Sequence, residues 1–192
     1  MGKTEPIRSH EDIDRLKQYY LAREEIRNYT MVTLAMNTSL RISDLLKLQW
    51  KDVYSFENNS YKKHIRITEQ KTGKETVIAI NHEAQSALKK LQDTQKRIEG
   101  NTYIFKSRVG QNQPIGRIAA FKIIKNAATE LGIEGIISCH SLRKTFGYHS
   151  WKNGVPPALI MSIYNHSSLE ITKRYLGIEQ DDKDAVFLML NL

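Results

Sequence analysis

Apolar residues recur at helical spacing along most of this 192-residue chain, and the exception is a central region between residues 53 and 80. Spacings of three and four between apolar residues are typical of amphipathic helices. The central region instead contains short strand-like runs, separated by turn residues such as Asn58, Asn59 and Ser60. We therefore predict one mainly α-helical domain with a small antiparallel β-sheet inserted into it, which is an α+β fold.

The pattern predicts helices over residues 10–26, 29–36, 40–48, 84–98, 115–131, 139–153 and 157–164, and a last short helix that contains Tyr175. In the helix over residues 115–131, the side chains expected on one apolar side are those of Ile118, Phe121, Ile124 and Ala128. A three-stranded antiparallel sheet is predicted from residues 53–56, 64–68 and 75–80. The first eight residues are expected to form a loose basic arm.

The charge balance favours a polyanionic partner, because 29 Lys and Arg residues stand against 21 Asp and Glu residues, a formal net charge of +8. The single cysteine, Cys139, excludes an internal disulfide framework. The sequence has no apolar run of about 18 residues and no apolar signal region near its start, so we expect no membrane span. These features predict a cytoplasmic protein that binds nucleic acid.

The segment SSLEITKRYLG, over residues 167–177, places a tyrosine near the end of a short helix. Ser167 and Glu170 have the spacing of a capping box, and Gly177 is a suitable helix stop. A tyrosine near a helix end can be repositioned by a small hinge, which suits a nucleophile. The alternative is that Tyr175, one of nine tyrosines, simply packs on a neighbour.

Two arginines lie near the starts of predicted helices, and each has a polar residue three positions away, so that the two side chains of each pair share a helix face. Asp44 follows Arg41 and could hold its guanidinium, although a surface ion pair of little value is the alternative. His140 precedes Arg143, and both could face one anion at a helix N-terminus. An ordinary polar first turn would have the same sequence.

Two further groups could move protons. Lys71 lies in the turn before the third predicted strand, where a flexible ammonium group could enter a groove and donate a proton. Lys74 competes for this role, and a merely solvated lysine is the alternative. His166, just before the Tyr175 helix, could donate to a phosphate oxygen or could be a satisfied, half-buried histidine.

Together these residues suit phosphoryl transfer. Guanidinium groups match the charged oxygens of a phosphodiester under attack. Tyr175 would be the nucleophile and would form a covalent phosphotyrosyl intermediate. Lys71 would protonate the leaving alkoxide. The cations are built into the protein, so we expect no metal and no other cofactor.

Four segments, in order along the chain, resemble the catalytic domain of the tyrosine recombinases, the lambda-integrase family. They are TSLRISDLLKLQWKDV, ITEQKTGKETVIAI, CHSLRKTFGYH and YNHSSLEITKRYLGI. The resemblance implies a tyrosine recombinase catalytic fold. It also implies that the catalytic residues are Arg41, Lys71 rather than Lys74, His140, Arg143, His166 and the nucleophile Tyr175, with Asp44 in a supporting role.

The chain departs from the family in two respects. It has Tyr164 and Asn165 before His166, where the family often has Leu and Gly. Arg41 also comes too early for a separate N-terminal DNA-clamping domain. We therefore expect a single catalytic domain over residues 1–192, similar to the short fimbrial-switch inversion recombinases, or else an excised catalytic domain.

By this resemblance, the function is site-specific recombination or integration of double-stranded DNA through a 3′-phosphotyrosine, without ATP. The protein would be a monomer in solution, and four protomers would assemble on two DNA sites. The apolar tail, with Val186, Phe187, Leu188 and Leu190, resembles the segment that docks on a neighbouring protomer. Packing of the tail on its own domain is the alternative.

Three other functions fit parts of the pattern. One is a DNA-binding module with an inert Tyr175, and another is relaxation of DNA in the manner of a type IB topoisomerase. A third is a metal site built from Cys139, His140, His149 and His166, whose spacings match no zinc pattern. For DNA contacts outside the reacting centre, the basic side chains predicted are Arg117, Lys122, Lys125 and Lys144.

Overall fold

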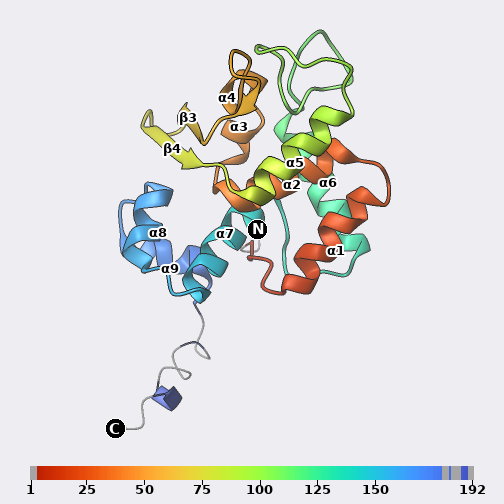
Figure 1. Cartoon of the computed structure of the whole chain (residues 1–192). Coiled ribbons are helices and arrows are strands. Elements are labelled where there is room, and N and C mark those ends of the chain that lie inside the picture. The colour runs from red at the N-terminus through yellow and green to blue at the C-terminus, as the bar shows by residue number, and fades with distance from the viewer. Residues whose placement is uncertain (1–3, 179–181, 183–186, 190–192) are drawn as a thin grey trace.

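The computed structural model describes residues 4–178, 182 and 187–189. Its elements, in chain order, are the helices α1 (His10–Leu21), α2 (Ile26–Thr38), α3 (Ile42–Leu45) and α4 (Trp50–Val53), the strands β1 (Tyr54–Ser55), β2 (Ser60–Tyr61), β3 (His64–Thr68) and β4 (Glu75–Ala79), and the helices α5 (His82–Asp93), α6 (Arg117–Glu130), α7 (Cys139–Lys152), α8 (Pro157–Tyr164) and α9 (Leu169–Leu176). This arrangement, drawn in Figure 1, confirms the predicted mainly helical fold with small antiparallel sheets.

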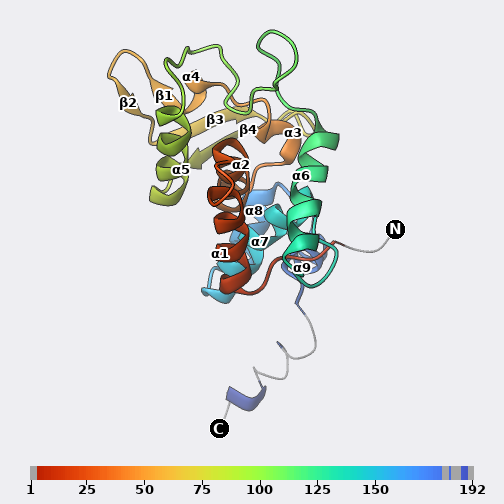
Figure 2. The same ribbon diagram turned by 90° about the vertical axis from the view of Figure 1, so that its right-hand side faces the viewer.

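Helix α2 is the centre of the larger core. Ten of its 13 residues are buried, because the segment is apolar or uncharged almost all round. It packs against α1, α5 and α7, and Figures 1 and 2 show it in the middle of this group. The C-terminus of α2 leads to Arg41, so the most buried helix of the fold carries the first predicted site residue.

A smaller core joins the last three helices. Ile160 and Tyr164 of α8 and Leu176 of α9 are fully buried together, with Phe146 of α7 packed against them. Tyr175 also packs on this cluster. The position of the predicted nucleophile therefore depends on this C-terminal group of helices, which the lower part of Figure 1 shows.

The predicted three-stranded sheet is wrong. The structure has two separate two-stranded sheets, in which Tyr54 pairs with Tyr61 and His64 pairs with Ala79. The chain turns back soon after Tyr54, at Asn59, whose φ is 48°. Strand β1 therefore pairs with β2, and β3 pairs with β4 in a separate sheet. The β3–β4 turn lies where it was predicted, and Gly73 supplies its positive φ of 67°.

The helices predicted over residues 10–26 and 84–98 end earlier, at Leu21 and Asp93. Two other helix predictions need a larger correction. The helix expected over residues 40–48 is a single turn, α3, because Ser39 adopts a left-handed φ of 55° and delays the helix start. On α6, Ile118 and Phe121 are 74% and 43% exposed instead of facing the core. The smaller side chains of Ala120 and Ala127 are buried instead, together with Ile124. Small residues allow helices to approach closely, so this face packs inward.

The described part of the N-terminal arm is docked, which contradicts the expectation of a loose segment. Ile7 is 1% exposed, and its backbone N–H donates to Oγ1 of Thr145 on α7 at 2.9 Å. Lys144 donates to the carbonyl of Thr4 at 2.5 Å. Residues 1–3 lie outside the described residues.

Serine side chains cap two of the helices that flank the fold. Ser9 caps α1 by accepting the backbone N–H of Asp12. Ser168, not Ser167, caps α9 and accepts the N–H of Ile171. The predicted capping box of Ser167 and Glu170 is therefore wrong, because the residue three positions after Ser168 is an isoleucine, which cannot return a hydrogen bond. Gly177 ends α9 in the left-handed region, as predicted.

The tail is described only in part. Phe187 and Leu188 are 77% and 79% exposed, so these two side chains do not pack on their own domain. Val186 and Leu190 lie outside the described residues. In the described part of the chain, no helix is both long and apolar enough to cross a bilayer.

Candidate active site

The predicted site residues come from four parts of the fold that meet on one side of the molecule. Arg41 is the N-cap residue of α3, and Lys71 lies in the β3–β4 turn. His140 and Arg143 lie in the first turns of α7. His166 lies just before α9, and Tyr175 lies in the last turn of α9. In Figure 1 the β3–β4 hairpin lies above α8 and α9, with α7 beside them.

Tyr175 lies among aromatic and imidazole rings. Its hydroxyl is hydrogen-bonded to Nε2 of His140. The ring centroids of His166 and His140 are 4.5 Å and 5.0 Å away. The nucleophile predicted from sequence is therefore half-buried, with its reactive oxygen held against an imidazole nitrogen.

Both imidazoles of the site are neutral at pH 7. Burial and the charges of nearby cations, including Arg143 and Arg41, lower the pKa of His140 and of His166 to about 4. A neutral His140 can accept the Tyr175 proton at Nε2. Burial raises the pKa of Tyr175 against the opposing effect of Arg143 and Arg41, so this hydroxyl needs a base to become an oxyanion. His166 in turn shares a hydrogen bond of 3.0 Å between Nδ1 and Oγ1 of the buried Thr172.

Arg143 is 3% exposed and is held by two backbone carbonyls. Its Nη1 donates to the carbonyl of Ser39, and its Nη2 donates to the carbonyl of Tyr164 at 3.1 Å. Its Nε is buried and has no hydrogen-bond partner among the residues that the structure describes. A buried donor without a partner is costly, so this N–H indicates a place where an acceptor would be stabilising.

Arg41 is paired with Glu69, not with Asp44 as predicted. The distance from its Nη1 to Oε2 of Glu69 is 2.6 Å, and Glu69 is 2% exposed. Burial alone would raise the pKa of Glu69, but the hydrogen bond from Thr72 and the charge of Arg41 outweigh it and lower this pKa. Glu69 is therefore the carboxylate that orients Arg41.

Sequence reasoning missed Glu69, although a signal was present. Ile65, Ile67 and Glu69 alternate along β3 and just beyond it, so the acid follows two inward-facing residues on the same face. A carboxylate in register with a buried face needs a partner, and the nearby arginine supplies it.

Asp44 has a different role from the one predicted. Its Oδ1 accepts the backbone N–H of Gln70 at 3.1 Å, and the side-chain amide of Gln70 donates to the carbonyl of Ser43 at 3.1 Å. These bonds tie α3 to the residue before Lys71. Lys71 and Lys74 are both exposed, and the charge of Lys71 contributes to the low pKa of both site histidines.

The four lysine and arginine residues predicted to contact DNA fall into two groups. Arg117, Lys122 and Lys125 are exposed on α6. Lys144 is buried, and its Nζ lies 5.6 Å from the centroid of the Tyr175 ring. Its surroundings are those of the Tyr175 site and not of an open surface.

The proposed metal ligands do not come together. Within the described residues, no group of three or more His, Cys, Asp and Glu side chains could hold a metal ion. Cys139, His140, His149 and His166 therefore form no such cluster.

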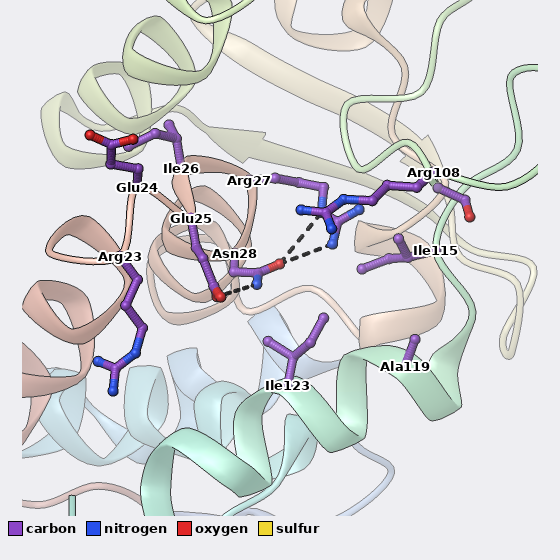
Figure 3. Close-up of a pocket in the computed structure, with 11 residues that line it drawn as sticks. Arg23, Glu24, Glu25, Ile26, Arg27, Asn28, Arg108, Ile115, Ala119 and Ile123 are labelled. Atoms are coloured by element: carbon purple, nitrogen blue, oxygen red, sulfur yellow. Dashed lines mark hydrogen bonds between the residues drawn. The ribbon is translucent and has the colours of Figure 1, made fainter. Parts of the chain in front are cut away.

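A separate hollow of about 600 Å³ lies between the N-terminal end of α2 and α6 (Figure 3). Arg27 and Arg108 line it, and Nε of Arg27 donates to Oδ1 of Asn28 at 3.4 Å. Its lining includes none of the predicted site residues, so the site around Tyr175 is distinct from this hollow.

Comparison with known proteins gives one family and several similar chains. The model described as "Phage integrase family" matches residues 8–181. The "Probable integrase/recombinase YoeC" of Bacillus subtilis (strain 168) is 41% identical over 187 residues, 97% of each chain. The crystal structure of XerA recombinase matches with a TM-score of 0.77 at 20% identity, covering 100% of this chain and 66% of that chain.

A DNA-bound structure has the same fold. The XerH site-specific recombinase, bound to its palindromic difH substrate in a post-cleavage complex, matches with a TM-score of 0.74 at 16% identity. That match covers 98% of this chain and 54% of the XerH chain. This chain thus spans about two thirds or less of the two crystallised recombinases, and nearly the whole of the Bacillus relative.

The Arg41–Glu69 pair generates a stability prediction. Glu69→Gln should lower the free energy of unfolding at pH 7 by about 2 kcal/mol, because the guanidinium loses its buried counter-charge. Urea unfolding measures the change. Glu170→Gln, which removes an exposed pair with Arg174, is the matched control and should cost less than about 0.5 kcal/mol. Equal losses in the two variants would contradict the role given to Glu69.

The site histidines generate a pH prediction. Their pKa of about 4 in the folded protein lies below the ordinary value of 6.5, so the unfolded chain binds more protons between these values. Each histidine should therefore reduce stability progressively as the pH falls from 6.5 to 4, with no further loss below 4. NMR titration of the imidazole ring protons measures the two pKa values directly. Midpoints near 6.5 would contradict the claim that burial and nearby cations lower the pKa of these histidines.

Proposed function

Because this chain belongs to the phage integrase family, we propose that it is a tyrosine-type site-specific recombinase that cuts and rejoins double-stranded DNA. The observation that carries the proposal is the hydrogen bond between the Tyr175 hydroxyl and the neutral His140, beside the buried Arg143. A nucleophile, a base and fixed positive charge are the three requirements for attack on a phosphodiester.

In the proposed cleavage step, Tyr175 is the nucleophile and His140 is the base. The Tyr175 oxygen forms a bond to the scissile phosphorus while its proton passes to Nε2 of His140. The bond from phosphorus to the 5′-oxygen breaks, which leaves a 3′-phosphotyrosine and a 5′-oxygen that must gain a proton. Attack by the 5′-hydroxyl of a partner strand reverses the step, so the energy of the phosphodiester is retained without ATP.

The cations of the site would stabilise the charge on the phosphate. The buried Nε–H of Arg143 is unpaired within the described residues, and Arg41 is oriented by Glu69. Charge-assisted hydrogen bonds from guanidinium groups are among the strongest that proteins make to phosphate oxygens. His166, held by Thr172, is placed to donate from its other ring nitrogen. Fixed donors in a half-buried site need no reorganisation as the charge develops.

Lys71 is the proposed acid for the leaving group. It lies on the exposed β3–β4 turn, where Asp44 fixes only the preceding backbone N–H of Gln70. A flexible ammonium next to a fixed anchor can enter the groove of bound DNA and protonate the 5′-oxygen. Lys74 stands on the far side of Gly73, whose left-handed backbone turns the chain back.

Helix α6 is the proposed reader of the DNA sequence. Ile118, Phe121, Lys122 and Lys125 have helical spacing and are all exposed, so they form one apolar and basic stripe. Apolar side chains contact the methyl group of thymine in the major groove, and lysines contact phosphates. Arg117 at the start of the helix adds another cation. Lys144 is proposed to act near Tyr175, because it is buried beside that ring.

We also propose that the protein is a monomer in solution and a tetramer on two DNA sites. The exposed Phe187 and Leu188 of the tail suit contact with a second protomer. Sedimentation of the protein with and without its DNA site measures both states.

Two other activities are less favoured. A DNA-binding module without catalysis would not require a base at the Tyr175 hydroxyl. Relaxation in the manner of a type IB topoisomerase would use the same chemistry without a target site. Family membership and the likeness to YoeC support recombination instead.

An adduct experiment tests the proposed function. Sheared DNA from the source organism, incubated with the protein and then with SDS, should yield covalent protein–DNA adducts, and sequencing of the bound DNA should reveal one recurring site. Tyr175→Phe should abolish the adduct while binding is retained, because only the hydroxyl is removed. Tyr148→Phe, on a half-buried tyrosine of α7, is the control. Salt-sensitive binding without any adduct would support the non-catalytic module.

The α6 stripe can be tested on the recovered site. Lys122→Ala should weaken binding of all duplexes alike and reduce the slope of log K against log salt by about 1. Ile118→Ala should instead lose about 1 kcal/mol of discrimination between the site and an altered duplex, with an unchanged salt slope. Fluorescence anisotropy over a salt series measures both quantities. If Ile118→Ala discriminates between the two duplexes as well as the wild type does, the bases are read by another part of the protein.

A further inference from the structure

Tyr164 and Arg143 hold each other by two hydrogen bonds that run in opposite directions. The Tyr164 hydroxyl donates to the carbonyl of Arg143 at 2.6 Å, and Nη2 of Arg143 donates to the carbonyl of Tyr164 at 3.1 Å. The guanidinium carbon also lies 4.6 Å from the centroid of the Tyr164 ring. Tyr164 is 0% exposed, so this reciprocal contact is shielded from water.

The buried ring is fitted to α7 by a glycine. A Cβ added to Gly147 would lie 2.4 Å from the Tyr164 hydroxyl oxygen and 2.9 Å from a ring carbon. Any other residue at this position would push the ring away. Glycine in the middle of a helix lowers stability relative to alanine. Here the missing Cβ leaves the space that the Tyr164 ring occupies, and we call this space beside Gly147 the seat of Tyr164.

The same ring contacts the other reacting groups. Its centroid lies 5.0 Å from that of His166 and 5.3 Å from that of Tyr175. One buried side chain therefore touches the proposed nucleophile, one histidine and one arginine. Its hydroxyl stays protonated because burial raises its pKa.

The contact leaves one donor of Arg143 unused. Nη1 donates to the carbonyl of Ser39 and Nη2 to the carbonyl of Tyr164, while the buried Nε makes no hydrogen bond within the described part of the chain. Arginine presents its donors in a rigid plane, so fixing two nitrogens fixes the direction of the third.

We propose that Tyr164 is a positioning residue for the cleavage reaction, which acts through Arg143, and that Gly147 is the seat that makes this position possible. This inference rests on the proposed function. Tyr164 does not contact the phosphate in the proposal. It sets the direction in which the guanidinium meets the charged oxygens, and an error of about 1 Å there can cost about 100-fold in rate.

The test compares two substrates that differ only in charge at the scissile phosphate. Both are duplexes of the site recovered from the SDS adducts, with a nick that prevents religation. One has the ordinary phosphodiester, and the other has a methylphosphonate, in which a methyl group replaces one charged oxygen. The rate of covalent adduct formation is measured in single turnover for the wild type, Tyr164→Phe, Tyr164→Leu and Gly147→Ala.

Tyr164→Phe and Tyr164→Leu should slow the phosphodiester reaction by about 10-fold and about 100-fold. On the neutral methylphosphonate the same variants should lose less than about threefold, because a guanidinium has less charge to stabilise. Binding of the duplex should be unchanged. A variant that merely loosened the helices would slow both substrates by the same factor, which would overturn the inference.

Tyr20→Phe is the matched control. Tyr20 is 1% exposed, and its hydroxyl also donates to a backbone carbonyl, that of Ile123 at 3.0 Å, but in the larger core. Its loss should lower the melting temperature about as much as Tyr164→Phe does and leave both cleavage rates unchanged. Equal slowing by both variants would assign the effect to stability alone.

The seat is tested by non-additivity. Gly147→Ala should slow the phosphodiester reaction in the wild type, but should have much less effect in Tyr164→Leu, because the clashing ring is already gone. Independent effects of the two changes would overturn the role given to Gly147.

A readout without DNA separates this inference from the proposed function. Burial lowers the pKa of His166 most, and the charge of Arg143 lowers it further. Tyr164→Leu should therefore raise this pKa part of the way toward 6.5 in an NMR titration, because the displaced Arg143 charge no longer contributes. Tyr20→Phe should leave it unchanged. If the wild type forms no adduct, the proposed function fails whatever the titration gives. If the wild type is active and Tyr164→Phe cleaves both substrates at the wild-type rate, this inference fails alone.

Discussion

The buried charge of Arg143 is the constraint on which the rest of the site depends. A guanidinium that is 3% exposed must find its hydrogen-bond partners within the protein. It finds them in the carbonyls of Ser39, which follows α2, and Tyr164, which ends α8. Ser39 can offer its carbonyl because its left-handed backbone breaks the path between α2 and α3. One side chain therefore joins the large core to the C-terminal helices and fixes the distance between Arg41 and the Tyr175 helix.

The charges around this arginine are unbalanced in a way that suits a phosphate. Glu69 pairs with Arg41, and Asp44 is used to hold the hairpin backbone. The two site histidines stay neutral because burial and the surrounding cations lower their pKa. The site therefore has an excess of positive charge. This charge surrounds the hydroxyl of Tyr175, which is hydrogen-bonded to Nε2 of His140. An anionic ligand would reduce the repulsion among the cations, and the same ligand is the proposed substrate.

The sequence predicted those features that local chemistry decides. Helical periodicity, the stop at Gly177 and the turn between β3 and β4 depend on neighbours along the chain, and the structure agrees with them. The pairing of Arg41 with Glu69, the division of the strands into two sheets and the outward face of α6 depend on contacts between distant segments. Ile118 and Phe121 were assigned to the core because they are apolar, whereas packing between helices favoured Ala120 and Ala127. Spacing along one helix cannot reveal which face its neighbours require.

The central claim is that the cations converge on the hydroxyl of Tyr175 and make it the nucleophile. Mass spectrometry of the trapped adduct tests this most directly. Trypsin cuts after Arg174 and releases the peptide over residues 175–183, which has Tyr175 as its only hydroxyl-bearing residue. After nuclease digestion, the account predicts that this peptide carries a nucleotide joined through phosphate to Tyr175. A nucleotide on any other peptide, or an adduct that persists in Tyr175→Phe, would contradict it.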